Sequence, residues 1–282
     1  MNETEGGRVW LITGASSGFG RAIAEAALNA GDTVVAGVRR PAAMDDLAAR
    51  YPGRATAVEL DVTDGRQVTA AVAQTMLWHG RIDVLVNNAG RGLVGAVEET
   101  TDRELRDLMD VHFFGPAALI RVVLPHMRAQ RSGAIVNLTS MGGRASFAGV
   151  GAYSATKFAL EGLSEALAPE VAPFGIKVLI AEPGAFRTGF AGGALQRSPA
   201  LPAYADITGP VRADLPATSG SQPGDPARAA AAILQALESD KTPLRLALGN
   251  DAADMIAAYL DDSRAEFSAW EHITRSTDYD AV

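Results

Sequence analysis

The sequence predicts a single-domain, doubly wound α/β fold, in which a parallel sheet of about seven strands has helices on both faces. Short, β-rich apolar runs alternate regularly with longer helical patterns along the 282 residues. The runs are almost continuously apolar, which is typical of strands that are buried on both faces. No shift of composition marks a domain boundary before residue 185, so we expect one domain over residues 1–282.

The expected strands are seven apolar segments: 8–13, 33–38, 55–61, 82–87, 134–139, 176–182 and 244–248. The expected helices are the amphipathic segments between and after them: 18–30, 41–51, 64–79, 101–130, 151–173, 225–239 and 250–272. From 185 to 225 the chain is irregular and rich in Gly, Pro and Ser. A loop of that length is either disordered or a functional lid. We interpret it as a substrate lid containing short helices, and 250–282 as a C-terminal extension.

Composition excludes several classes of function. The formal net charge is −8 and the pI about 5.1, which disfavours binding to nucleic acid or to anionic membranes. Cysteine is absent, so disulfides and thiolate metal ligands are excluded, and the histidines lack ligand spacing, so we predict no metal site. The N-terminus does not resemble a signal peptide, and no apolar run approaches the roughly 20 residues of a membrane helix. We therefore expect a cytoplasmic protein.

A glycine-rich turn follows the first predicted strand. The segment "TGASSGFGRAIAEAAL" places Gly14, Gly18 and Gly20 between a buried strand and an amphipathic helix. Glycines at this point let the backbone turn tightly and approach a pyrophosphate, which would bind the exposed N–H groups of the helix start. The strand–turn–helix context favours nucleotide binding over an ordinary turn.

The end of the second predicted strand indicates which dinucleotide is bound. In dinucleotide-binding folds, an acidic residue there contacts the 2′-hydroxyl of NAD, whereas an arginine accommodates the 2′-phosphate of NADP. The segment "VVAGVRRP" has no carboxylate and carries Arg39 and Arg40. The arginines alone could be surface charges, but the missing acid independently disfavours NAD. We predict NADP(H), with Arg39 as the phosphate ligand.

Tyr153 and Lys157 lie four residues apart in a predicted helix, and this spacing places them on one face. They could be a half-buried tyrosine and a solvated surface lysine. Alternatively, the ammonium lies beside the phenol and lowers its pKa towards working pH, where acid–base catalysis is most efficient.

Several motifs in order decide between these interpretations. "TGASSGFG", "DVTD" at 61–64, "NNAG" at 87–90, Ser140, "YSATK" and "EPGAFRT" at 182–188 resemble the short-chain dehydrogenases/reductases of the single-domain branch. Within that branch the chain looks most like the hydroxysteroid-dehydrogenase-like reductases. The resemblance covers roughly residues 8–248 and implies a Rossmann-type fold.

The resemblance assigns roles to matching positions. It implies Ser140, Tyr153 and Lys157 as the catalytic serine, tyrosine and lysine, with Lys157 and Tyr153 also contacting the cofactor. It implies a cofactor site built from the pyrophosphate turn, the adenosine-side segments and the residues near the nicotinamide: Gly14, Ser16, Ser17, Gly18, Phe19 and Gly20; Asp61, Val62, Asn88, Ala89 and Gly90; Pro183, Gly184 and Thr188.

One position departs from the family pattern. The family usually has an asparagine in the helix after "NNAG", whereas the segment "DVHFFG" at 110–115 places His112 there. In the family this residue shapes a local distortion of the helix, and its main-chain carbonyl holds a water that reaches the lysine. We expect His112 to support catalysis through its backbone and position, the rival being an imidazole that titrates near pH 6.5.

The expected activity is the NADP(H)-dependent interconversion of a ketone or aldehyde and an alcohol, with Tyr153 as acid/base and Ser140 bonded to the substrate oxygen. Apolar lid residues predict a mostly apolar small-molecule substrate: Phe186, Phe190, Leu195, Leu201 and Tyr204. The resemblance further implies a homodimer or homotetramer. The alternatives are a catalytically silent NADP-binding sensor and a sugar-nucleotide epimerase or dehydratase, which the intact catalytic set and the glycine spacing respectively disfavour.

Overall fold

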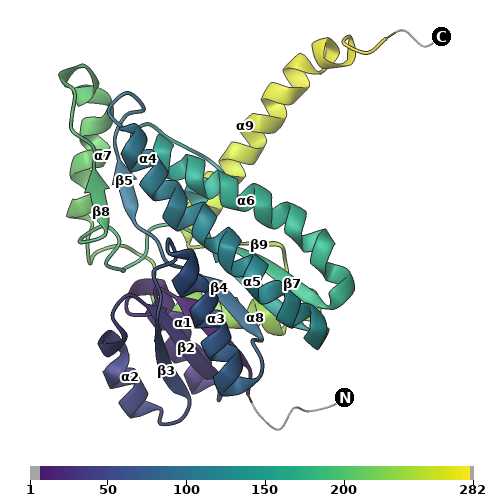
Figure 1. The fold of residues 1–282 in the computed structure, drawn as a ribbon. Coiled ribbons are helices and arrows are strands. Elements are labelled where there is room, and N and C mark those ends of the chain that lie inside the picture. The colour runs from purple at the N-terminus through teal and green to yellow at the C-terminus, as the bar shows by residue number, and fades with distance from the viewer. Residues whose placement is uncertain (1–6, 280–282) are drawn as a thin grey trace.

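The computed structural model describes residues 7–279. Seven strands form one parallel sheet in the order β3-β2-β1-β4-β6-β7-β9 (Figure 1). They are β1 Val9–Thr13, β2 Thr33–Val38, β3 Ala55–Glu59, β4 Val84–Asn87, β6 Gly133–Leu138, β7 Ile176–Pro183 and β9 Arg245–Leu248. The predicted doubly wound parallel sheet is confirmed. Its order reverses between β1 and β4, where open α/β sheets bind ligands.

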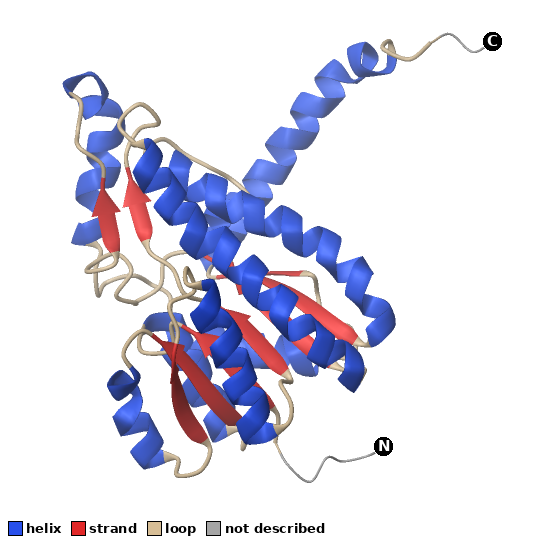
Figure 2. Cartoon of the chain, viewed as in Figure 1, coloured by secondary structure: helices blue, strands red, loops and turns tan. Residues whose placement is uncertain are grey.

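Helices cover both faces of this sheet (Figure 2). They are α1 Gly18–Asn29, α2 Asp45–Arg50, α3 Gly65–His79, α4 Asp102–Met109, α5 Gly115–Gln130, α6 Gly151–Val171, α7 Ala205–Ala217, α8 Pro226–Glu238 and α9 Asn250–Arg275. In β1, Trp10 and Ile12 join the core under α1 and α8, while Leu11 joins the core under α3, α5 and α6. Burial on both faces explains the continuous apolar runs.

The helix predicted over 101–130 is interrupted. A π-helical turn over Asp110–Phe114 separates α4 from α5, and it contains His112. By length and composition alone the stretch Asp102–Gln130 could cross a membrane, which the sequence did not lead us to expect. In this structure α5 contributes Leu119, Val123 and Met127 to the core.

The segment 185–225 is more regular than predicted. It contains β8 Leu195–Arg197, which pairs in parallel with β5 Gly92–Val94, and the thirteen-residue helix α7. The two-stranded sheet stands beside α7, apart from the main sheet (Figure 2). The strands β5 and β8 have three residues each, which is too short to give a periodic pattern. Helix α7 was not predicted because it contains Pro210 and Pro216, and proline normally interrupts a helix.

A buried carboxylate anchors this segment to the body of the domain. Glu99, in the loop after β5, accepts hydrogen bonds from the backbone N–H of Leu201 at 2.8 Å and of Ala96 at 2.7 Å. Arg212 on α7 adds a third bond to Glu99 at 2.5 Å and also donates to Ser198 O at 2.9 Å. The bonds from Leu201, Ala96 and Arg212 lower the pKa of Glu99 to about 2.

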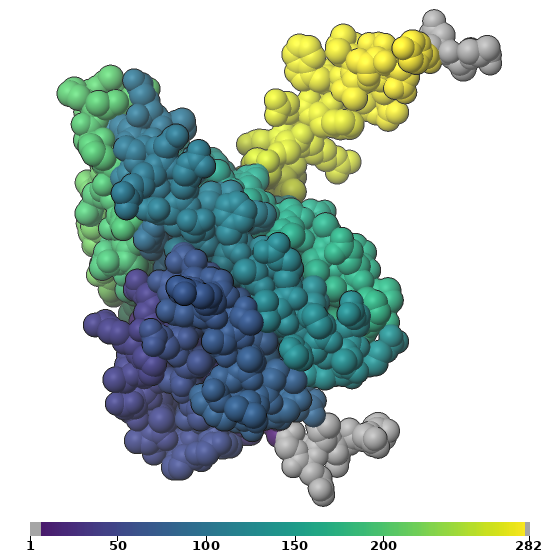
Figure 3. All heavy atoms as spheres, in the orientation of Figure 1, coloured from purple at the N-terminus to yellow at the C-terminus, as the bar shows by residue number. Residues whose placement is uncertain are grey.

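Helix α9 begins against the domain and then extends away from it (Figure 3). Ala252 and Ile256 are buried near its start, whereas Phe267 and Trp270 further along are exposed. Near its first turn, Asp251 accepts a hydrogen bond from the N–H of Ala185 at 2.6 Å. The start of the predicted C-terminal extension therefore helps to fix the start of the predicted lid.

Replacing Glu99 should release the lid segment. Glu99→Gln leaves Arg212 without its anionic partner, so we expect faster hydrogen exchange over residues 198–217 and a lower melting temperature at pH 7. The pKa of Glu99 is lowered by folding, so its stabilisation is present above the ordinary pKa near 4.5 and is lost as the pH falls towards 2. The difference in melting temperature between wild type and variant should therefore shrink below pH 4.

The matched control is Glu98→Gln. Glu98 lies on the same loop as Glu99 but is exposed, and it accepts a hydrogen bond from the Tyr204 hydroxyl at 2.6 Å. Equal exchange rates in the Glu98 and Glu99 variants would contradict the anchoring role of Glu99.

Candidate active site

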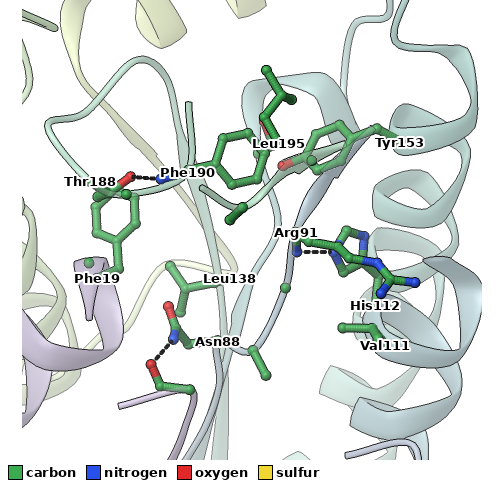
Figure 4. A pocket seen from close by; sticks show the side chains of 18 of the residues that line it. Phe19, Asn88, Arg91, Val111, His112, Leu138, Tyr153, Thr188, Phe190 and Leu195 are labelled. Carbon is green, nitrogen blue, oxygen red and sulfur yellow. Dashed lines mark hydrogen bonds between the residues drawn. The ribbon is translucent and has the colours of Figure 1, made fainter. Parts of the chain in front are cut away.

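A cavity of about 970 Å³ opens at the carboxyl ends of the central strands (Figure 4). Eighteen of the sequence-predicted site residues line it: Gly14, Ser16, Ser17, Gly18, Phe19, Arg39, Asp61, Val62, Asn88, Ala89, Gly90, His112, Ser140, Tyr153, Lys157, Pro183, Gly184 and Thr188. The parallel sheet brings these distant segments to one edge because their strands all end there.

The glycine turn after β1 adopts a backbone that only glycine adopts freely. Gly14 has φ +66° and Gly18 has φ +54°. A Cβ on Gly14 would lie 3.0 Å from the Cα of Ala89, so the close approach of two backbones also requires glycine there. Ser17 caps α1 without a side-chain bond, and no acidic residue occupies the first turn of that helix. The helix start can therefore receive an anionic group such as a pyrophosphate.

Gly20 does not line the cavity, contrary to the prediction. A Cβ there would lie 2.4 Å from Asn88 Nδ2 and 2.5 Å from Gly14 O. Gly20 therefore allows α1 to pack closely behind the turn. The Asn88 side chain also holds the turn, because it donates to Thr13 O at 2.8 Å and to Gly14 O at 3.2 Å.

The residues that were predicted to contact the adenosine moiety line the cavity near the ends of β2 and β3. Val38 is buried at the end of β2, and Arg39 next to it is exposed at the rim. Asp61 Oδ1 accepts from the backbone N–H of Thr63 at 3.0 Å and from its hydroxyl at 2.7 Å. Burial raises the pKa of Asp61, but the Thr63 bonds and the charges of Arg39 and Arg91 outweigh it and leave the pKa lowered. Asp61 is therefore an ionised acceptor.

Lys157 and Tyr153 do lie on one face of α6, turned towards the end of β6. The Lys157 ammonium is buried and donates to Leu138 O at 2.9 Å, and its Nζ lies 5.7 Å from the centre of the Tyr153 ring. Ser140, two residues beyond Leu138, accepts from the N–H of Gly142 at 3.0 Å. The reading of Lys157 as a solvated surface charge is wrong.

The prediction that neighbouring protein groups lower the pKa of Tyr153 is also wrong. Burial raises the pKa of the phenol to about 12, and a hydrogen bond with Ser140 offsets only part of that rise. Burial likewise lowers the pKa of Lys157 to about 8, against the opposing charge of Glu161. Desolvation penalises the charged form of both groups. The phenol is therefore protonated at neutral pH and can donate a proton.

His112 connects two parts of the site through its imidazole. Nε2 accepts from the backbone N–H of Arg91 at 3.0 Å (Figure 4). Nδ1 lies 2.8 Å from Thr156 Oγ1. Because the Thr156 hydroxyl donates to Tyr153 O at 2.7 Å, Nδ1 must carry the proton and donate to it. Burial, with the charges of Lys157 and Arg91, holds the pKa of His112 well below its usual range. The rival expectation of a titration near pH 6.5 is not supported.

Apolar side chains form the wall near Tyr153. The Phe190 ring lies 5.7 Å from the Tyr153 ring, and Phe147, Val150 and Leu195 also line the cavity. Two predicted lid contacts are absent from this wall among the described residues. Leu201 is partly exposed, and the Tyr204 hydroxyl bonds Glu98. Both residues precede α7 in the sequence.

Two polar residues next to the site were not predicted from the sequence. Glu161 is four residues beyond Lys157, and its carboxylate accepts from Thr139 at 2.6 Å. The same four-residue spacing that identifies Tyr153 and Lys157 continues to Glu161 and could have identified it. Thr139 carries no such signal because its partner is distant in sequence.

Comparison with known proteins identifies the family. The family profile described as short chain dehydrogenase matches residues 8–198. Oxidoreductase BOA17 of Botryotinia fuckeliana is 38% identical over 268 residues, which cover 95% of this chain and 98% of that protein. The 3-ketodihydrosphingosine reductase of Bacteroides thetaiotaomicron is 44% identical over 183 residues, which cover 65% of each chain.

Solved structures of similar proteins indicate the same family. A short-chain dehydrogenase from Streptomyces avermitilis is 61% identical, with a TM-score of 0.91 over 96% of this chain and 100% of that one. A family member from Burkholderia phymatum in complex with NAD is 26% identical, with a TM-score of 0.80 and all of both chains covered. Another from Burkholderia cenocepacia in complex with NADP is 27% identical, with a TM-score of 0.73 over 94% of this chain and 97% of that one. The chain belongs to the short-chain dehydrogenase/reductase family of oxidoreductases.

Proposed function

We propose that the protein uses NADP(H) to interconvert a ketone or aldehyde and an alcohol, with Tyr153 as the acid/base. The observation that carries the proposal is the convergence of Ser140, Tyr153 and Lys157 on the same cavity that contains the glycine turn. The name of the Bacteroides relative, a 3-ketodihydrosphingosine reductase, supports the reduction of a ketone.

The residues present fit a dinucleotide. The turn at Gly14 and Gly18 leaves room for a pyrophosphate, and Asp61 offers an acceptor to the adenine. Pro183 and Thr188 also line the cavity, with Thr188 beside Gly18. When bound, the nicotinamide supplies or accepts the hydride.

The chain's own groups handle the proton and the substrate oxygen. In the reductive direction Tyr153 donates its proton to the oxygen of the carbonyl as negative charge develops there. Ser140 bonds the same oxygen. The Lys157 ammonium stabilises the phenolate that Tyr153 becomes, because an adjacent positive charge favours the charged form. In the oxidative direction the same groups act in reverse.

The preference for NADP(H) rests on the end of β2. Arg39 is exposed at the rim of the cavity, and the neighbouring Val38 supplies no carboxylate for a ribose 2′-hydroxyl. The structural relatives include complexes with NAD and with NADP, so they do not indicate a preference. We infer the preference for NADP(H) from Val38 and Arg39 of this chain.

The substrate surface is mostly apolar, and the segment 185–225 acts as its lid. Phe190 and Leu195 extend from this segment into the cavity beside Tyr153. The anchor at Glu99 holds the outer part of the segment, so movement on ligand binding is confined to the stretch between Thr188 and Leu195. Closing over the cavity excludes water from the proton transfer.

Removing the Tyr153 hydroxyl should abolish turnover without loss of cofactor binding. We expect Tyr153→Phe to lower kcat by about 10²- to 10⁴-fold, the usual contribution of a general acid. NADPH affinity, measured by fluorescence titration, should stay near that of the wild type. Tyr204→Phe is the control, because that hydroxyl lies outside the cavity. Near-normal turnover in Tyr153→Phe would refute the assignment. NADPH binding by the wild type without turnover of any carbonyl would favour a silent sensor.

Exchanging the residues at the end of β2 should reverse the cofactor preference. A charge-assisted arginine–phosphate bond contributes roughly 1.5–3 kcal/mol, so the wild type should prefer NADPH by about tenfold or more in kcat/KM. Val38→Asp with Arg39→Ala should prefer NADH. Arg40→Ala tests the exposed neighbour and should leave the preference unchanged. Equal kcat/KM values for the two cofactors in the wild type would contradict the proposal.

His112→Asn should keep the pH profile of kcat. The imidazole is neutral across the working range, so its removal takes away no ionisation between about pH 6 and 7. An asparagine can still accept from the N–H of Arg91, whereas His112→Phe leaves that buried donor unpaired and should lower the melting temperature more. A limb near pH 6.5 that is present in the wild type and absent in His112→Asn would show that the imidazole joins the proton relay.

A further inference from the structure

A buried carboxylate lies one helical turn beyond Lys157. Glu161 is 4% exposed, and its Oε1 accepts a hydrogen bond from Thr139 Oγ1 at 2.6 Å. Thr139 is the last residue before Ser140, and its own side chain is also buried. This bond therefore joins α6 to the end of β6 immediately next to the catalytic serine.

Three consecutive residues at the end of β6, Leu138, Thr139 and Ser140, each face the active site or a side chain of α6. Leu138 accepts from Lys157, Thr139 donates to Glu161, and Ser140 faces the cavity with Tyr153. Two side chains of α6, four residues apart, thus hold the backbone on the N-terminal side of Ser140. The separation between the serine and the Tyr153–Lys157 pair depends on both attachments.

The loop after Ser140 packs closely against the side chains of Lys157 and Glu161. A Cβ on Gly143 would lie 3.3 Å from Glu161 Oε1 and 3.3 Å from Lys157 Cβ. Glu161 and Lys157 therefore flank one glycine, and the carboxylate lies beside the stem of the lysine.

Arg245 pairs with this carboxylate, and the neighbouring carboxylate of Glu182 pairs with both Arg245 and Arg144. Arg245 on β9 lies 3.1 Å from Glu161 and 3.6 Å from Glu182 on β7, and Arg144 lies 3.2 Å from Glu182. Burial raises the pKa of Glu161, as does the charge of Glu182, while the Thr139 bond and Arg245 oppose the rise. Buried ion pairs often contribute little net stability, so a role in positioning explains this cluster better than a role in stability.

We propose that Glu161 is a positioning residue for the hydride-transfer reaction: it fixes the backbone beside Ser140 through Thr139 and places an anionic neighbour next to the Lys157 ammonium. This inference rests on the proposed function. The charged and titratable groups around the pair come from every adjoining element: Tyr153 and Glu165 on α6, His112 in the π-helical turn, Arg144 after β6, Glu182 on β7 and Arg245 on β9.

The first test measures the titration of Lys157 without any substrate. The chain has three lysines, Lys157, Lys177 and Lys241, so protein labelled with ¹³C at lysine Cε gives three resolvable NMR signals. Loss of a negative neighbour disfavours the ammonium. Glu161→Gln should therefore lower the titration midpoint of Lys157 by roughly one pH unit.

The matched control is Glu165→Gln. Glu165 lies one turn further along α6 and bonds the same Arg245 at 3.0 Å, but its side chain is 63% exposed and does not reach Thr139. The Lys157 midpoint should stay at its wild-type value in this variant. An unchanged midpoint in Glu161→Gln, or an equal shift in Glu165→Gln, would overturn the electrostatic half of the inference.

The second test separates the hydrogen bond from the charge, and it serves even where Glu161→Gln fails to fold. Thr139→Val removes the hydroxyl, including its longer contact with Ala181 O at 3.1 Å, and leaves the Glu161 carboxylate, whereas Thr139→Ser keeps the donor. We expect Thr139→Val to lower kcat by about tenfold or more with little change in the KM for NADPH, because small misplacements of reacting groups are costly. Thr139→Ser should retain wild-type kcat. Equal kcat values in the two variants would overturn the positioning role.

The two proposals fail in different ways. A wild type without turnover of any carbonyl would overturn the proposed function, while the Lys157 midpoint in Glu161→Gln would still decide the electrostatic half of the inference. A wild type with turnover, combined with unchanged Lys157 titration and unchanged Thr139→Val kinetics, would overturn the inference alone.

Discussion

The buried hydrogen bond from the Lys157 ammonium to Leu138 O is the contact on which the candidate site depends. A buried cation is costly unless it is paired, so this bond fixes how α6 lies against the end of β6. Tyr153 is one turn before the lysine, and Glu161 is one turn after it. Because all three lie on the same face of α6, a single contact places the acid, the ammonium and the second attachment to β6.

The electrostatics of the site follow from its burial. The carbonyl that holds Lys157 is neutral, so desolvation dominates, and the pKa of the lysine is lowered to about 8 while that of Tyr153 is raised to about 12. A protonated phenol suits the donation of a proton to a reduced substrate. Anionic character near the lysine comes from Glu161, which the Thr139 bond and Arg245 keep close to the catalytic edge.

Sequence periodicity predicted the main sheet and most helices because buried strands and amphipathic helices leave long, regular patterns. It also predicted that Tyr153 and Lys157 share a face of α6. It did not predict β5 and β8, whose three residues leave no period, or α7, which contains two prolines. The Thr139–Glu161 bond joins residues 22 positions apart, and the balance between burial and charge at Tyr153 depends on the packed structure. Such features require the three-dimensional arrangement.

The transfer of a labelled hydride tests the central claim most directly. NADPH carrying deuterium at both C4 positions is incubated with the wild-type protein and a panel of apolar ketones, and the alcohols are examined by mass spectrometry. The account predicts one deuterium on the carbinol carbon of the product, and no labelled product with Tyr153→Phe. Alcohol formed without deuterium, or no alcohol from any ketone despite bound NADPH, would contradict it.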